Sequence, residues 1–188
     1  MENVVVAFVA LDSELTEPGW LNRYAASAAP KVDGEAPKRP VIHCELFFPG
    51  RDKLTGTAYG IFFNGLVWKN SNKRYNRKNY LFKTVAMKQA QKKNALAFLD
   101  AQVGKSFNLL GYVSFLTYCK VSGNLPGFER KFYCSQLVMG ALNASGVFGR
   151  GVTMHEDVHP HAVFDQLTQI TVVSAHPIKQ RGKLKFIL

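Results

Sequence analysis

One cysteine and one histidine–glutamate pair are the residues of this sequence whose types and spacing suit covalent chemistry. Cys134 lies in the segment FYCSQLV at residues 132–138, where the pattern predicts the first turn of a helix. His43 and Glu45 lie two residues apart in the apolar segment 41–48, which predicts a strand. Residues two apart on a strand project from the same face, so Glu45 can lie beside the imidazole.

The nucleophile of a cysteine site is the thiolate, and a thiol with a pKa of about 8.5 is mostly protonated at neutral pH. A helix N-terminus and a neighbouring imidazole both lower that pKa. If the two segments meet, Cys134 is the nucleophile, His43 is the base, and Glu45 orients the base. The alternative interpretation makes Cys134 a small buried hydrophobe and His43 a structural histidine.

The other two cysteines are predicted to be core residues. Cys44 projects from the strand face opposite to its neighbours His43 and Glu45. Cys119 lies in an apolar stretch. Three cysteines are an odd and low number for a disulfide scaffold, so we expect a chain without disulfides.

Apolar segments bounded by Gly, Pro and Asn predict the elements that must position these residues. Strands are expected at residues 4–11, 41–48, 57–63 with a continuation at 65–69, 79–86, 169–174 and 184–188. Helices are expected at residues 20–26, 88–103, 107–119, 133–144 and 160–167. This order predicts an α+β fold in which an antiparallel β-meander or small barrel packs against the helix that bears Cys134.

The order of the motifs resembles the circularly permuted branch of the NlpC/P60 papain-like superfamily. That branch includes lecithin–retinol-acyltransferase-like, bacterial YiiX-like and poxvirus-type proteins. Besides the histidine strand, three segments carry the resemblance: YCSQLV at residues 133–138, GKSFN at 104–108 and VHPHAVFDQL at 158–167. The pattern covers roughly residues 41–167. It implies a circularly permuted papain-like fold, with residues 1–188 as a single domain of this kind.

The resemblance also implies a function. Cys134 matches the family's nucleophile and His43 its general base. Many relatives carry the third polar residue on the strand after the histidine strand, where this sequence offers only Thr55, Thr57, Tyr59 and Asn64. None of these is acidic, so Glu45 is the candidate for the third role. The family's activities imply a thiol hydrolase or acyltransferase that acts on an amide or ester of a peptide or lipid through a thioester intermediate. The alternative is a catalytically retired member that serves as a structural or anion-binding protein.

Length and hydropathy limit the class of protein. The 188 residues, 47% of them hydrophobic, suffice for one domain with a substantial core. The N-terminus is not basic, and the apolar run at residues 4–11 is too short to span a membrane. With no signal peptide and no transmembrane segment recognised, we expect a cytoplasmic or otherwise intracellular protein. A viral origin, as in the poxvirus-type relatives, would make it virion-associated or an infected-cell protein.

The net charge of +11 is unevenly distributed along the chain. No acidic residue occurs between Asp52 and Asp100, and the stretch from Lys69 to Lys93 is rich in lysine and arginine interleaved with aromatic residues. Such a field favours an anionic partner, either an anionic membrane surface or a nucleic acid. The other interpretations are a solvated face that keeps the protein soluble and a contact with an acidic neighbour in an assembly.

A cluster of histidines late in the chain raises the question of a metal. The cluster consists of His155, Glu156, Asp157, His159 and His161. Its spacing matches no closed zinc site, and no thiol pair lies nearby. A polar loop ahead of a helix that begins with proline explains it instead. We therefore predict no metal, and attack of a thiol on a carbonyl requires no cofactor.

Overall fold

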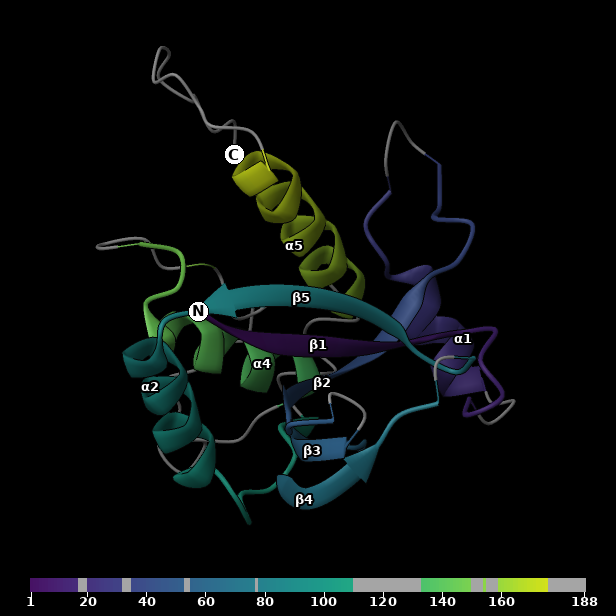
Figure 1. Ribbon diagram of the computed structural model, residues 1–188. Coiled ribbons are helices and arrows are strands. Elements are labelled where there is room, and N and C mark those ends of the chain that lie inside the picture. Colours follow the sequence, from purple (N-terminus) through teal and green to yellow (C-terminus); the bar gives the residue numbers. More distant parts are fainter. Residues whose placement is uncertain are drawn as a thin grey trace.

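The protein has an α+β fold with one five-stranded antiparallel sheet (Figure 1). The computed structural model describes residues 1–16, 20–31, 35–52, 55–76, 78–109, 133–149, 154 and 159–175. The strands are β1 (Glu2–Ala10), β2 (Val41–Pro49), β3 (Thr55–Gly60), β4 (Trp68–Arg74) and β5 (Leu81–Met87). The helices described are α1 (Trp20–Ser27), α2 (Gln89–Asp100), α4 (Cys134–Ser145) and α5 (Pro160–Ala175). The coarse α+β prediction is therefore confirmed.

The strand order β4-β3-β2-β1-β5 places the strand of His43 at the centre of the sheet. Strands β2, β3 and β4 follow one another as the predicted meander does. The last strand of that predicted meander, at residues 79–86, is β5, and it pairs with β1 at the other side of the sheet instead of with β4. Within the described residues the sheet is open, with β4 and β5 at its two edges. In the β1–β2 register Val9 lies opposite His43 and Ala10 opposite Val41, so a β-bulge leaves Ile42 between these two pairs.

One face of the sheet carries the main hydrophobic core. Alternate residues of β1 and β2, among them Phe8 and Leu46, are completely buried on this face together with Leu137 and Leu142 of α4. α4 packs against β2, and α2 packs against α4. This arrangement directs the beginning of α4, and with it Cys134, towards the middle of the sheet.

The opposite face of β2 is covered by aromatic side chains from the segment that joins β4 to β5. The ring of Tyr75 lies 5.0 Å from that of Phe47 and 4.7 Å from that of Tyr80. Because both faces of β2 are covered, Glu45 is fully buried although it points away from the helices. A charged residue so enclosed requires partners, and these define the site described below.

Two predicted elements differ from the structure. Strand β4 was predicted only as a continuation at residues 65–69, yet it spans Trp68–Arg74. Its residues WKNSNKR do not alternate between apolar and polar types, because a largely exposed edge strand buries no face that would require apolar side chains. The expected turn before it is present: Asn64 has φ 57°, and the Gly65 N–H donates to the Phe62 carbonyl.

The strand predicted at residues 169–174 is wrong, because α5 continues from Pro160 to Ala175. The β-branched residues there favour a strand only weakly and in context. A helix that has already begun gains one hydrogen bond for each residue added, and this gain outweighs the weak preference of these residues for a strand.

Several predictions concern parts of the chain outside the described residues. They are the helix at 107–119 beyond residue 109, Cys119, the strand at 184–188, and the cluster residues His155, Glu156 and Asp157. Among the described helices, none is both long and apolar enough to cross a membrane.

Candidate active site

Helix capping fixes Cys134 at the first position of α4. The backbone of Tyr133 is extended, with φ −106° and ψ 170°, and its N–H donates to Gln136 Oε1 at 3.3 Å. Its carbonyl accepts the first helical hydrogen bond, from the N–H of Leu137 at 3.1 Å. First-turn N–H groups have no partner within a helix, and the macrodipole is positive at this end. Negative charge on the Cys134 sulfur is therefore favoured, and the first turn contains no acidic residue to compete with it.

Cys134 meets β2 along the part of that strand which β3 does not cover. β3 pairs only with residues 46–49 of β2, whereas the β1 ladder on the other side extends to Val41. The backbone of Cys44 donates a hydrogen bond to the Cys134 sulfur. The Cys44 N–H, which has no partner in β3, thereby finds its hydrogen-bond acceptor in the Cys134 sulfur.

The side chains of His43 and Cys134 are hydrogen bonded to each other. The hydrogen bond from the Cys44 thiol is the largest influence on Cys134, and together with the hydrogen bond and charge of His43 it lowers the pKa of this thiol against the effect of burial. Burial alone would lower the pKa of His43, but its bonds and charge interactions with Cys134 and Glu45 raise it to about 10. At neutral pH the pair is therefore a thiolate beside an imidazolium.

Glu45 is completely buried, and three groups hold its carboxylate. Its Oε1 lies 3.3 Å from His43 Nε2, and its Oε2 accepts a hydrogen bond from the Tyr75 hydroxyl and lies 3.7 Å from Lys73 Nζ. Burial would raise the pKa of this carboxyl, but these partners, His43 first among them, lower it. Glu45 is therefore ionised and balances the charge of the imidazolium.

Tyr75 acts as a donor to Glu45 throughout the physiological pH range. Burial and then the charge of Glu45 raise the pKa of its hydroxyl, so the proton stays on the phenol. The same two causes raise the pKa of the neighbouring Tyr80 to about 12. Tyr75 and Lys73 thus hold one oxygen of the carboxylate, Oε2, and leave the other, Oε1, directed towards His43.

A stack of rings fixes the plane of the imidazole. Phe62 lies parallel to His43 with ring centroids 5.0 Å apart, and Trp68 lies behind Phe62 at 5.8 Å. A Cβ at Gly60 would lie 2.7 Å from the Trp68 ring and 3.1 Å from Glu45 Cγ, so only glycine fits there. Half of Phe62 is exposed, and the His43 side chain retains 14% of its surface. The imidazole is therefore held rigidly at the edge of the solvent.

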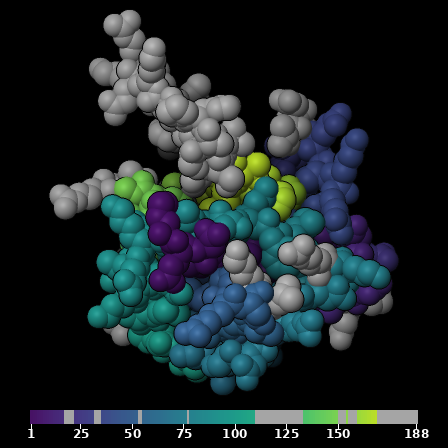
Figure 2. All heavy atoms as spheres, in the orientation of Figure 1, coloured from purple at the N-terminus to yellow at the C-terminus, as the bar shows by residue number. Residues whose placement is uncertain are grey.

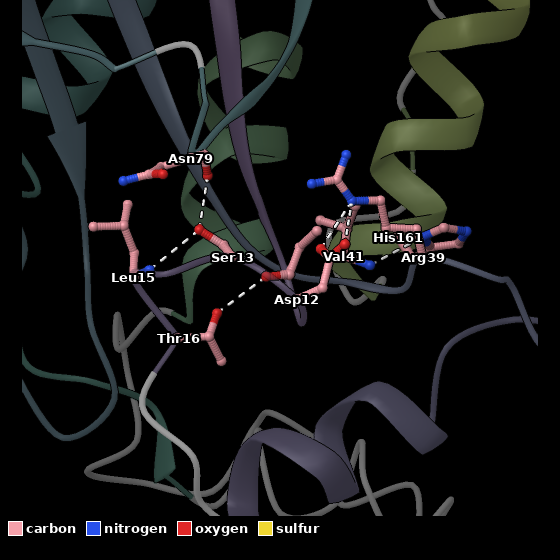
Figure 3. A network of polar contacts seen from close by, with 9 residues as sticks. Asp12, Ser13, Leu15, Thr16, Arg39, Val41, Asn79 and His161 are labelled. Atoms are coloured by element: carbon pink, nitrogen blue, oxygen red, sulfur yellow. Dashed lines mark hydrogen bonds and ion pairs between the residues drawn. The ribbon is translucent and has the colours of Figure 1, made fainter.

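The start of β2 is anchored by two histidines that take no part in the pair. The His161 Nδ1 accepts a hydrogen bond from the Val41 N–H at 3.2 Å (Figure 3). The His159 ring accepts a bond from the His161 N–H at 3.0 Å and donates one to the Ala25 carbonyl at 2.8 Å. These bonds tie the beginning of α5 to α1 and β2. Within the described residues no group of three potential ligands could hold a metal ion.

The structure brings together all three residues that the sequence nominated. Cys134, His43 and Glu45 form one continuous hydrogen-bonded chain, while their catalytic roles remain a prediction. Two of the alternatives for the third role, Tyr59 and Thr55, are bound to other carboxylates. The Tyr59 hydroxyl donates to Asp100 at 2.7 Å, and the Thr55 hydroxyl donates to Asp52.

Three further residues of the site escaped sequence reasoning. Tyr75 and Lys73 lie in a polar segment that gives no sign of approaching Glu45, and only the tertiary fold brings them there. Cys44 is the buried core residue that was predicted, yet its thiol bonds to Cys134. The prediction of a core residue is confirmed, but the contact with Cys134 was not predicted, because it depends on where the beginning of α4 packs against β2.

In comparisons with known proteins, no family model, no curated protein and no solved structure matched this chain. The chemical argument therefore rests on the site itself. A thiolate at a helix N-terminus, a protonated imidazole beside it and a buried carboxylate behind the imidazole are the parts needed for nucleophilic attack and proton transfer.

The variant Tyr75→Phe tests the support of Glu45. We expect it to lower the free energy of unfolding by about 1.5 to 3 kcal/mol, because a hydrogen bond to a charged, buried group is lost. Urea unfolding at pH 7 measures the difference. Tyr80→Phe, which removes a neighbouring hydroxyl from the same ring cluster, is the matched control and should change stability less. Equal losses in the two variants would contradict a specific role of Tyr75.

Proposed function

We propose that this protein is a thiol hydrolase or acyltransferase that acts on an amide or ester carbonyl. The observation that carries the proposal is the hydrogen-bonded chain from Cys134 through His43 to the buried carboxylate of Glu45. A structural cysteine in a core is protonated and inert, whereas a thiolate held beside an imidazolium is a nucleophile with its acid already in place.

The proposed reaction has two steps. The Cys134 thiolate attacks the carbonyl carbon, and the oxyanion is stabilised by backbone N–H groups at the start of α4. His43 then gives its proton to the leaving amine or alcohol, which leaves a thioester on Cys134. In the second step neutral His43 removes a proton from water or an acceptor alcohol or amine, which attacks the thioester and frees the thiol. Glu45 holds the imidazole in position in both steps and does not itself react.

An activated ester provides the first experiment. With p-nitrophenyl acetate we expect a burst of nitrophenolate and an acetyl group on Cys134, found by peptide mapping and removed by neutral hydroxylamine. Cys134→Ala should give neither the burst nor the adduct, and Cys119→Ser should behave as the wild type does. A folded wild-type protein that acquires no acyl group on Cys134 would contradict the proposal.

A second proposal, an anionic partner, is favoured by the basic surface. Residues of β3 to α2, blue to teal in Figure 2, cover much of the face shown. The exposed basic residues among them are Lys69, Arg74, Lys78, Lys88 and Lys93. Lys69 is paired with Asp100, so the charge of the stretch is partly balanced. Binding to anionic vesicles or to nucleic acid that weakens steeply with salt would support this role.

A further inference from the structure

Cys44 and Cys134 form a pair of thiols within one site. Both are free cysteines, and they come from adjacent elements, β2 and α4. Their side chains are hydrogen bonded to each other, and a backbone bond from Cys44 to the Cys134 sulfur holds the two residues in register. A disulfide requires two sulfurs that can approach to about 2.04 Å with their Cβ atoms on suitable sides. The hydrogen bond places the two sulfurs next to each other, which is the first condition for forming this bond.

The two thiols differ in reactivity. Cys134 keeps 6% of its surface exposed and Cys44 none. Burial, followed by the bond to Cys134, raises the pKa of the Cys44 thiol, whereas the pKa of Cys134 is lowered. Oxidants attack thiolates at the surface first. Cys134 therefore reacts with an oxidant first, and Cys44 is placed as the partner that reacts second.

We propose that Cys134 and Cys44 are the site of a reversible oxidative modification, an intramolecular disulfide formed when the protein meets a hydroperoxide. Its effect on activity rests on the proposed function, because the disulfide consumes the proposed nucleophile. The formation of the bond itself depends only on the paired thiols.

The chemistry balances with a hydroperoxide as the oxidant. The Cys134 thiolate attacks the peroxide, an S–O bond forms as the O–O bond breaks, and the released alkoxide or hydroxide takes the proton of His43. The Cys44 sulfur then attacks the sulfenic sulfur, its proton passes to His43, and the sulfenic hydroxyl leaves as water with that proton. Two thiols and one hydroperoxide thus give a disulfide, one alcohol or water from the peroxide, and one further water.

The disulfide would protect the nucleophile from permanent damage. A sulfenic acid without a neighbouring thiol proceeds to the sulfinic acid, which ordinary reductants do not reverse. With Cys44 in contact, the sulfenic acid is consumed before a second peroxide arrives. A thiol reductant then restores both cysteines.

The test treats the whole protein with hydrogen peroxide and maps its peptides under non-reducing conditions. We expect a Cys44–Cys134 peptide pair, a loss of two hydrogen atoms in the intact mass, and loss of iodoacetamide labelling of Cys134 that dithiothreitol restores. In Cys44→Ser, or in Cys44→Ala should that variant fold better, Cys134 should accumulate sulfinic acid and should not recover. Cys119→Ser is the matched control and should form the disulfide.

Two results would overturn the inference. One is sulfinic acid on Cys134 of the wild type without any disulfide, and the other is a disulfide between Cys134 and Cys119. The acyl-transfer assay separates this inference from the proposed function. If the disulfide forms but Cys134 takes no acetyl group, the oxidative modification is supported and the proposed enzyme activity is contradicted. If Cys134 is acetylated but no disulfide forms, the enzyme activity is supported and the oxidative modification is contradicted.

Discussion

Replacing His43 with alanine should remove most of the reactivity of Cys134 at pH 6 and all turnover of an acyl substrate. The hydrogen bond from the Cys44 thiol lowers the pKa of Cys134 most, and burial opposes it. His43 supplies a further hydrogen bond and a positive charge, which lower the pKa again. Each unit by which the pKa rises above the working pH reduces the thiolate fraction about tenfold. We therefore expect the rate of iodoacetamide alkylation of Cys134 at pH 6 to fall at least about tenfold.

The measurement is a pH profile of alkylation from about pH 5 to 10, with peptide mapping to separate the cysteines. In the wild type the rate should reach its plateau at a lower pH than in the variant, because His43 contributes to the lowered pKa of Cys134. The pair should persist until the pH approaches the pKa of His43, about 10. Above the thiol pKa of the variant the two proteins should converge, which is the internal control. Identical alkylation profiles for the folded wild type and the folded His43→Ala variant would show that Cys134 and His43 form no ion pair.

Removing the Glu45 carboxylate should have the largest effect on stability. Glu45→Ala leaves the charges of His43 and Lys73 without their buried partner, and breaking one side of such a pair typically costs about 3 to 5 kcal/mol. Glu45→Gln keeps the shape and some hydrogen bonds, so we expect a smaller loss of stability and a partial loss of activity. Glu2→Ala, which breaks only the surface pair with Lys92, is the control and should change stability little.

The pH dependence of this effect has a defined sign. The pKa of Glu45 is lower in the folded protein than its ordinary value of 4.5. The carboxylate therefore contributes its full stabilisation above about pH 4.5 and loses it as the pH falls through the lowered folded value. Urea unfolding of the wild type and Glu45→Gln at several pH values should show a difference that shrinks towards acid. A difference that is constant over the whole range would contradict the assignment of an ionised Glu45.

Local patterns in the sequence were enough to predict the residues of the pair. The spacing of His43 and Glu45 on a strand requires a shared face, and the apolar periodicity after Cys134 requires a helix that begins there. Both rules depend only on the geometry of a single element. The succession of β2, β3 and β4 could be predicted for the same reason, since short loops join neighbouring strands. The pairing of β5 with β1 could not, because it joins strands that are far apart in the sequence.

The parts that depend on tertiary contacts could not be predicted in this way. Lys73 and Tyr75 reach Glu45 because the chain crosses β2 on its way from β4 to β5, and no local pattern encodes that crossing. The contact of Cys44 with Cys134 depends on where α4 docks along the edge of β2. In the same way, β4 is too exposed for a hydrophobic pattern.

The β1–β2 register, with Val9 opposite His43, sets a condition on when the thiol becomes reactive. A slip of one residue would send His43 and Glu45 to the face that Cys44 and Leu46 now occupy. An unfolded or misregistered chain therefore carries three ordinary thiols and no activated one. The thiolate forms only after the strands have aligned and α4 has docked. A newly made chain thus has only ordinary thiol reactivity until β2 and α4 meet, and the appearance of the activated thiolate reports that this contact has formed.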